Sequence, residues 1–346
     1  ILRNIYFCIP FEELRKHRKL TIKTRIMKQT RHLLIALALG TMLTSCGASV
    51  STATVTGPAA YVDPYIGSGG HGHVFVGASV PFGAIQAGPQ NIHKGWDWCS
   101  GYHHSDSIVI GFAHTHLSGT GCTDMGDVQI MPYTGELRSK RGRQEDIGGS
   151  CSSYYSHDNE SVSPGYYSLK MDNGVRIEMT ASTRTALHRI TYPEAEGRRL
   201  LINLEEGNGD GAYDTYLRQT DAHTVEGYRF SKGWGPHKVF FALTTDKPIR
   251  SLALFDADTP SEGSEIRCKG AKGVLTFDDE KQVMVKVAIS SVSSANALEN
   301  LRTEIPGWDF KAVQAEAIRR WNDELAAIDI ETADETAKKI FYTAMY

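Results

Sequence analysis

Short β-rich runs separated by Gly, Asn, Asp and Pro fill the chain from Tyr61 to about residue 290, and they restrict its fold more than any other feature. In Gln282–Ser290 (QVMVKVAIS) apolar residues occupy alternate positions, which is the period of a strand. The tripeptide Asp172–Gly174 (DNG) lies between two such runs and predicts a hairpin, because Asn-Gly supplies the positive φ angles of the turn. Many short strands without intervening helices predict a large antiparallel β-sandwich over residues 59–293.

The individual strands are predicted from their apolar alternation and from the turn residues at their ends. They are Ile85–Ala87, Ser107–Phe112, Val128–Pro132, Tyr166–Met171, Val175–Ala181, Thr185–Tyr192, Arg199–Asn203, Thr224–Phe230, Lys238–Thr244, Ile249–Leu254, Gly273–Phe277 and Gln282–Ser290.

The hydrophobic period changes from two to between three and four near Ser294. This spacing predicts helices over 295–305 and 309–330, separated by Pro306-Gly307. A third helix is expected from about Asp334, and no capping residue closes it before Tyr346. We expect residues 294–330 to be a helical linker and 331–346 to be the start of a truncated helical domain.

The N-terminal residues have the features of an export signal. From Met27 the sequence MKQTRHLLIALALGTMLTSC has a basic start and a short apolar stretch, and its last four residues resemble a bacterial lipobox. We expect a lipoprotein signal peptide over 27–46, acylation of Cys46, a leader with a mis-called start over 1–26 and a flexible tether over 47–58. A plain secretory signal is the alternative. The expected location is the periplasm or outer membrane, with a lipid anchor holding the chain to the membrane.

Charge and cysteine content narrow the class further. The net charge of −3 gives no tendency toward nucleic acid, so no nucleic-acid partner is expected. An oxidising compartment would allow disulfides among Cys99, Cys122, Cys151 and Cys268, but sequence does not select among the three pairings. A Cys99–Cys122 bridge and a buried unpaired Cys99 are both compatible with the sequence.

The segment WDWCSGYHHSDSIVIGFAHTHLSGTGCTDMGD (96–127) concentrates aromatic and polar residues around one short strand. Trp96 and Trp98 offer flat apolar faces beside many His and Asp side chains. A sugar ring presents an apolar C–H face and a belt of hydroxyls, so this combination suits a carbohydrate ligand. The alternative is that both Trp residues pack in the core and that the polar residues only tie loops together.

Two other chemistries would use residues of the same segment, and a third would use the Gly-rich loop that precedes it. His114 and His116, with Asp124 or Asp127, would suit a metallohydrolase. Cys99 with His103 or His104 would suit a nucleophile pair, although no local signature supports it. The Gly-rich loop at 67–73 lacks the Lys-Ser/Thr of a phosphate loop, so its glycines indicate a tight turn or a close backbone approach to a ligand or another domain.

Residues 61–90 and 96–127 resemble the N-terminal signature of glycoside hydrolase family 92. PGYYSLKM (164–171), TASTRTALHRITYP (180–193) and FYTAMY (341–346) are similar to the same family. The resemblance implies a calcium-dependent, inverting exo-α-mannosidase of the kind common in gut Bacteroidetes, acting on mannose-terminated N-glycans or mannan. It also implies a β-sandwich, linker helices and an (α/α)6 barrel, with the active site between sandwich and barrel.

The resemblance places the acid, the base and most Ca²⁺ ligands on the barrel, so no catalytic or metal-ligating residue is assigned in this chain, and the chain alone is expected to be inactive. The sandwich is expected to contribute one wall of the mannose pocket. The predicted substrate-binding residues are Gly70, His71, Trp96, Trp98, Cys99, His116 and Asp124. A non-catalytic carbohydrate-binding module is the alternative, and the helices after Ser294 argue against it.

Overall fold

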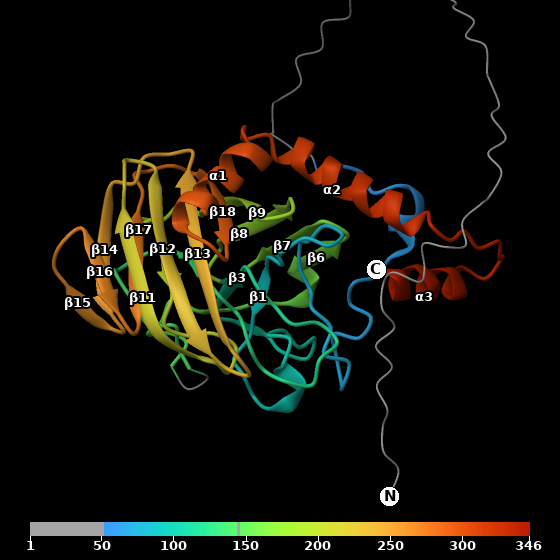
Figure 1. The fold of residues 1–346 in the computed structure, drawn as a ribbon, viewed down its shortest axis with the longest axis horizontal. Coiled ribbons are helices and arrows are strands. Elements are labelled where there is room, and N and C mark those ends of the chain that lie inside the picture. The colour runs from blue at the N-terminus through green and yellow to red at the C-terminus, as the bar shows by residue number, and fades with distance from the viewer. Residues whose placement is uncertain (1–51, 144–145) are drawn as a thin grey trace, which may run out of the picture. The chain divides into compact units, whose positions relative to one another are not determined.

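The computed structural model describes residues 52–143 and 146–346, which fold around two large β-sheets followed by three helices (Figure 1). The expected leader, signal peptide and lipidated Cys46 lie outside the described residues. Within those two ranges, no helix combines the length and the apolar character needed to cross a bilayer.

Every strand pair in the two sheets is antiparallel, as the sandwich prediction requires. The seven-stranded sheet has the order β1 (Gly88–Gln90), β3 (Gly111–Ala113), β4 (Gln129–Tyr133), β10 (Arg199–Asn203), β17 (Ala271–Thr276), β14 (Ser251–Asp256) and β15 (Thr259–Ser261). The nine-stranded sheet has the order β16 (Glu265–Cys268), β11 (Gly211–Gln219), β12 (Thr224–Lys232), β13 (Pro236–Thr245), β18 (Gln282–Ser290), β9 (Thr185–Thr191), β8 (Arg176–Ala181), β7 (Tyr166–Lys170) and β6 (Glu160–Ser163). A separate small sheet joins β2 (Ile108–Val109) to β5 (Ser153–Tyr154).

The main hydrophobic core lies between the two large sheets. Ile130 and its cross-strand neighbour Ile202 contribute from the seven-stranded sheet, and Ile177 and Val285 contribute from the nine-stranded sheet; all four are fully buried. Burial of apolar side chains on the facing sides of two sheets is the main favourable term for such a sandwich. The prediction of a mainly β chain with a large antiparallel sandwich is therefore confirmed.

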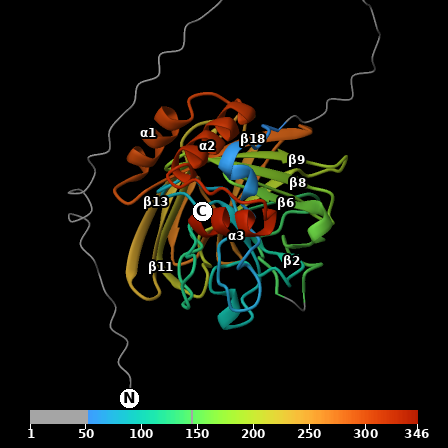
Figure 2. The ribbon, with the colours of Figure 1, turned by 90° about the vertical axis from the view of Figure 1, so that its right-hand side faces the viewer.

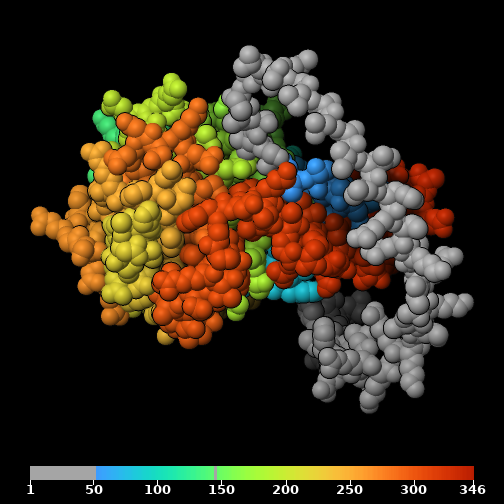
Figure 3. Space-filling view, turned by 90° about the horizontal axis from the view of Figure 1, so that it is seen from above, coloured from blue at the N-terminus to red at the C-terminus, as the bar shows by residue number. Residues whose placement is uncertain are grey.

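Three α-helices follow the last strand, and the first two cover part of the nine-stranded sheet on its outer side. They are α1 (Ser294–Glu304), which packs on β13 and β18, α2 (Phe310–Leu325), which packs on β8 and β9, and α3 (Glu335–Met345). Figure 3 shows α1 and α2 crossing one face of the unit, and Figure 2 shows α3 below them. The helix predicted over 309–330 is found as α2, and the apolar residues that recur at steps of three or four along it pack inward: Phe310, Ala317, Trp321 and Leu325 are buried, and Val313 is half-buried.

The linker between α1 and α2 is anchored to the sheet by a buried lysine. Lys286 in β18 donates from Nζ to the carbonyl of Ile305 at 2.7 Å, and its Nζ lies 4.0 Å from the ring centroid of Trp308. A lysine that both donates to a helix-end carbonyl and faces an indole ring satisfies its buried charge locally. The position of the helices is thus fixed by polar contacts as well as by packing.

The first described residues lie along α2. The backbone N–H of Ala53 donates to Gln314 Oε1 at 2.9 Å, and the short 3-10 helix η2 (Gly57–Tyr61) contacts α2 and α3. Val55 packs on the cluster that contains Trp321. Residues 53–58 of the expected tether are therefore held against the helices by specific contacts.

Several predicted strands differ from the structure. Ile85–Ala87 is not a strand, because these residues bond irregularly to Thr183 and Ala78, and β1 begins at Gly88. The run predicted over Ser107–Phe112 is divided at Ile110 into β2 and β3, which belong to different sheets. The predictions for β10 and β18 match the structure residue for residue.

Candidate functional site

The Gly-rich loop and the loop that carries Trp96 meet at the surface and form an aromatic rim. The ring centroid of Trp96, which belongs to the 3-10 helix η3 (Trp96–Trp98), lies 5.5 Å from that of His71 and 4.2 Å from that of His73. His71 Nδ1 donates to Asp97 Oδ1 at 2.6 Å, and this hydrogen bond is the main reason that the pKa of Asp97 is lowered. The Trp96 side chain stays 58% exposed, and its Nε1 donates to the carbonyl of Gly121 at 2.8 Å. Gly70, His71 and Trp96 are therefore brought together.

Trp98 faces a different environment from Trp96. Its ring stacks on His103 with centroids 4.4 Å apart, and its Nε1 donates to Asp106 Oδ2 at 2.9 Å. Lys94 completes this group, because its Nζ forms an ion pair with Asp106 at 2.9 Å. These contacts hold the loop together and leave Trp98 without the open ring face that Trp96 has.

Cys99 and His116 are buried beneath the rim. The thiol of Cys99 is fully buried and donates to the carbonyl of Thr120 at 2.8 Å, and burial raises its pKa. His116 donates from Nδ1 to the carbonyl of Gln86 at 2.9 Å and packs against Phe75. Both residues thus support the loops from below, and neither offers a surface to a ligand in this structure.

Asp124 is also buried, and it holds a residue that the sequence analysis missed. Its Oδ1 accepts the N–H of Met125 at 2.9 Å, and its Oδ2 accepts the N–H of Trp234 at 3.0 Å. Trp234 is at the tip of the β12–β13 hairpin and is 81% exposed. The Gly-Trp-Gly sequence at 233–235, between two predicted strands, was the available signal, since a large aromatic residue at a hairpin tip cannot be buried by its own strands.

A buried ionic network lies behind this hairpin. Arg229 is fully buried and donates from Nη1 to Asp127 Oδ1 at 2.6 Å and to Asp210 Oδ2 at 2.7 Å. His237 Nε2 lies 3.2 Å from Asp127 Oδ2, and the hydrogen bond to Asp127 raises the pKa of His237. A buried network of this kind is expensive to desolvate and strongly fixes the relative geometry of its members.

The hypotheses of a metallohydrolase and of a cysteine nucleophile do not agree with the structure. His114 donates from Nδ1 to the carbonyl of Val128 at 2.6 Å, so its Nε2 accepts a hydrogen bond from His188 Nε2 at 2.9 Å. Both nitrogens of His114 are thereby used, and burial lowers its pKa to about 4. The Cys99 thiol is directed at the Thr120 carbonyl, and His103 is bonded to Ser105 and Gly70. All four cysteines in the described residues carry unpaired thiols.

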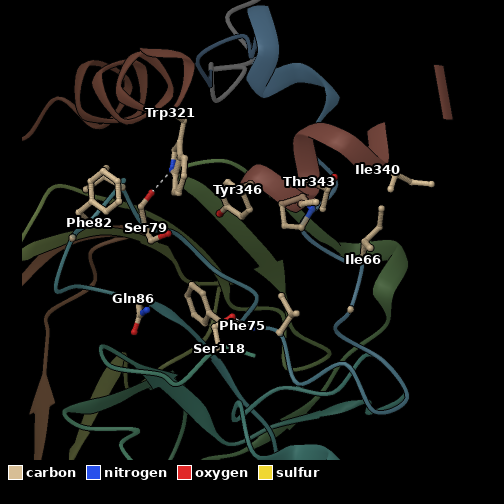
Figure 4. A pocket seen from close by; sticks show the side chains of 16 residues that line it. Ile66, Phe75, Ser79, Phe82, Gln86, Ser118, Trp321, Ile340, Thr343 and Tyr346 are labelled. Atoms are coloured by element: carbon tan, nitrogen blue, oxygen red, sulfur yellow. Dashed lines mark hydrogen bonds between the residues drawn. The ribbon is translucent and has the colours of Figure 1, made fainter. Parts of the chain in front are cut away.

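A cavity of about 600 Å³ separates the N-terminal loops from the last helices (Figure 4). Ile66, Phe75 and Gln86 line it from the loops, and Trp321 and Tyr346 line it from the helical side. Trp321 Nε1 donates to the carbonyl of Ser79 at 2.8 Å across this boundary. Phe75 also packs on His116. The Phe75 side chain therefore lies between the cavity and the buried histidine below the rim.

Known proteins that are similar to this chain include two solved structures and one relative known by its sequence. The family GH92 α-mannosidase BT3965 from Bacteroides thetaiotaomicron is 34% identical with a TM-score of 0.80, over 84% of this chain and 41% of that protein. The family GH92 inverting mannosidase BT2199 from the same organism shares the fold with 24% identity and a TM-score of 0.73, over 86% of this chain and 40% of that protein. An uncharacterized secreted glycosidase of Arthroderma benhamiae is 25% identical over 326 residues, which are 83% of this chain and 40% of that protein.

The chain thus spans about two fifths of the length of these relatives. Residues 61–290 match the glycosyl hydrolase family 92 N-terminal domain, and residues 296–346 match the family's catalytic domain. The chain therefore belongs to glycosyl hydrolase family 92.

Proposed function

We propose that this chain is the N-terminal part of an exo-acting, inverting α-mannosidase and that its aromatic rim forms one wall of the mannose-binding cleft. The observation that carries the proposal is the open face of Trp96 beside His71 and Asp97, on the loops that belong to the family domain. Support comes from BT3965, which is described as an α-mannosidase and for which a complex with mannoimidazole is known. Mannose-terminated oligosaccharides are the proposed substrates.

Each rim residue has a distinct proposed role. The exposed indole of Trp96 stacks on the C–H face of a sugar ring, while His71 and the backbone at Gly70 supply hydrogen bonds to hydroxyls. Trp234 extends the apolar surface from the hairpin tip. Trp98, Cys99, His116 and Asp124 keep the loops in place from below, as their buried contacts indicate.

The acid and the base are proposed to lie outside these 346 residues. An inverting glycosidase needs two carboxyl groups about 6.5–9.5 Å apart that flank the bond to be cut. Near the rim, Asp97 is bonded to His71, and Asp124 is committed to two backbone N–H groups. The chain also spans only about two fifths of its relatives, which leaves room for catalytic carboxylates elsewhere.

The acidic cluster behind the hairpin does not fit calcium. Ca²⁺ requires six to eight oxygen ligands, whereas Asp127 and Asp210 already balance their charge with the buried guanidinium of Arg229. We therefore propose no calcium ion at these residues. Export is supported by the secreted relative, and the lipid anchor at Cys46 remains part of the proposal.

The test measures binding and turnover separately. We expect the 346-residue chain to bind methyl α-mannoside saturably in isothermal titration or ligand-observed NMR, and not to release mannose from 4-nitrophenyl α-mannoside with Ca²⁺ present. Trp96→Ala should abolish binding, whereas Tyr213→Ala, which removes an exposed ring from β11, should leave it unchanged. Mannose release by this chain, or binding that persists in Trp96→Ala, would contradict the proposal. Methyl α-galactoside serves as the ligand control.

A further inference from the structure

Glu160, the first residue of β6, is a buried carboxylate surrounded by hydroxyl and imidazole groups. Its side chain is fully buried. Tyr167 donates from its hydroxyl to Oε1 at 2.6 Å, and Tyr102 donates to Oε2 at 3.0 Å. His157 Nδ1 lies 2.7 Å from Oε2. Among the described residues, this imidazole is the group that can form an ion pair with the carboxylate.

Several other buried carboxylates of the described chain have permanent cations as partners. Glu178 is paired with Arg189 at 2.8 Å, Asp106 with Lys94 at 2.9 Å, and Asp127 and Asp210 with Arg229. A buried carboxylate without a compensating cation is costly, because it loses hydration and gains little in return. Glu160 relies instead on an imidazole, which offers a charge only when protonated and is otherwise a metal ligand.

A second histidine completes the group. His104 stacks on His157 with ring centroids 4.2 Å apart, and one ligand atom each from His104, His157 and Glu160 lies within 4.8 Å of the other two. His104 is exposed, so an ion can reach the group from solvent. His104 comes from the loop after η3, whereas His157 belongs to η4 (His157–Asn159), which directly precedes β6.

We propose that His104, His157 and Glu160 bind a transition-metal ion of the Zn²⁺ type, at a site separate from the sugar-binding rim. Two imidazoles and one carboxylate form a common zinc ligand set, and nitrogen ligands select against Ca²⁺ and Mg²⁺. Tyr102 and Tyr167 orient the carboxylate from behind, as outer hydrogen-bond partners of metal ligands do. The ion would join the loop after η3 to η4 and so hold the base of the rim.

The other group with suitable ligand types is a useful contrast. Asp124, Asp210 and His237 also lie within 4.8 Å of one another. Arg229 already places a buried positive charge on Asp210, and His237 is bonded to Asp127 and Ser231. The guanidinium of Arg229 already supplies a positive charge to that group, so it would repel a divalent ion bound there.

The experiment uses the 346-residue chain freed of metals by a chelator. Isothermal titration with ZnCl₂ should show saturable uptake with a rise in melting temperature, while CaCl₂ and MgCl₂ should give neither at this site. His104→Ala and Glu160→Gln should each weaken Zn²⁺ uptake by at least about tenfold. His237→Ala is the matched control and should bind as the parent does. His104 is exposed, so loss of folding is not expected in His104→Ala.

Co²⁺ gives a second readout, because its visible absorption changes when imidazole and carboxylate ligands replace water. The Co²⁺ spectrum should appear in the parent and in His237→Ala and disappear in His104→Ala. The proposal is overturned if the parent takes up no Zn²⁺, or if uptake survives unchanged in His104→Ala and Glu160→Gln. These results do not depend on mannoside binding, so they separate this site from the proposed function.

Discussion

The carboxylate of Asp124 accepts the backbone N–H of Trp234 at 3.0 Å, across 110 positions of the chain. The same carboxylate accepts the N–H of Met125, so one side chain fixes both its own loop and the tip of the β12–β13 hairpin. Gly233 has no side chain at this contact, and a Cβ there would lie 2.4 Å from Asp124 Oδ1. The hairpin and the loop can therefore approach closely, which leaves the Trp234 ring in the open.

Trp234→Ala should weaken binding of an α-mannobioside while leaving the fold intact. Stacking of an aromatic ring contributes about 0.5–1.5 kcal/mol beyond the area that it buries, which corresponds to roughly a two- to tenfold change in affinity. An 81% exposed side chain contributes little to folding, so the free energy of unfolding should change by less than about 0.5 kcal/mol. Titration calorimetry measures the change in affinity, and urea unfolding measures the change in stability. Equal affinity of parent and variant would remove Trp234 from the proposed cleft.

Arg229→Met should destabilise the chain strongly, because it leaves Asp127 and Asp210 buried without their cation. Removing one member of a buried ion pair typically costs about 3–5 kcal/mol. Arg218→Met is the control: Arg218 pairs with Glu226 at the surface, where such pairs contribute about 0–1 kcal/mol. Urea unfolding measures the stability of both variants. Similar losses of stability in Arg229→Met and Arg218→Met would show that burial of the ion pair does not determine its contribution.

The fold was predictable where local pattern and burial agree. β18 has an apolar period of two and lies in the middle of its sheet, so sequence and structure coincide there. β11 was not predicted, because its exposed face carries Asp214, Tyr216 and Arg218 in place of apolar residues. Cross-strand contacts stabilise that face, including the stacked rings of Tyr216 and Tyr228, and these become visible only when the strands are paired.

The site was predictable only as a set of loops. Sequence grouped Trp96 with Trp98, but a turn of the 3-10 helix directs one ring toward His71 and the other toward His103. His114 and His116 were considered metal ligands, although backbone carbonyls of Val128 and Gln86 occupy their Nδ1 atoms. Such partners come from distant segments, and a single sequence gives no sign of them.

Acidification below pH 6.5 should destabilise the chain through His114 and His188. Burial lowers the pKa of His114 to about 4 and that of His188 well below its usual value, so both are neutral in the folded state. Between about pH 6.5 and pH 4 the unfolded chain binds more protons than the folded chain, so stability falls as the pH falls. At about 1.4 kcal/mol per pKa unit, His114 alone contributes a loss on the order of 3 kcal/mol.

Urea unfolding from pH 7 to pH 4.5 checks this dependence. His188→Gln removes one titrating group and keeps a donor for His114, so the slope of stability against pH should become shallower. Trp234→Ala, which removes an exposed side chain without a titratable group, is the control and should keep the parent slope. An unchanged slope in His188→Gln would show that another group governs acid unfolding.

Glu304→Ala should release α1 and the start of α2 from the sandwich. At the end of α1, Glu304 accepts hydrogen bonds from the Ser182 hydroxyl at 2.6 Å and from the N–H and Nε of Arg184, both at 2.7 Å. The side chain is only 11% exposed, and bonds to a charged group contribute about 1.5–3 kcal/mol. Hydrogen–deuterium exchange should therefore be faster in residues 294–325 and unchanged in β10.

Glu316→Ala, which breaks an exposed pair with Arg319 on α2, should leave exchange near the parent rate because surface pairs contribute little. Slow exchange throughout α1 in Glu304→Ala would mean that Lys286 and the apolar contacts hold the helices without this carboxylate.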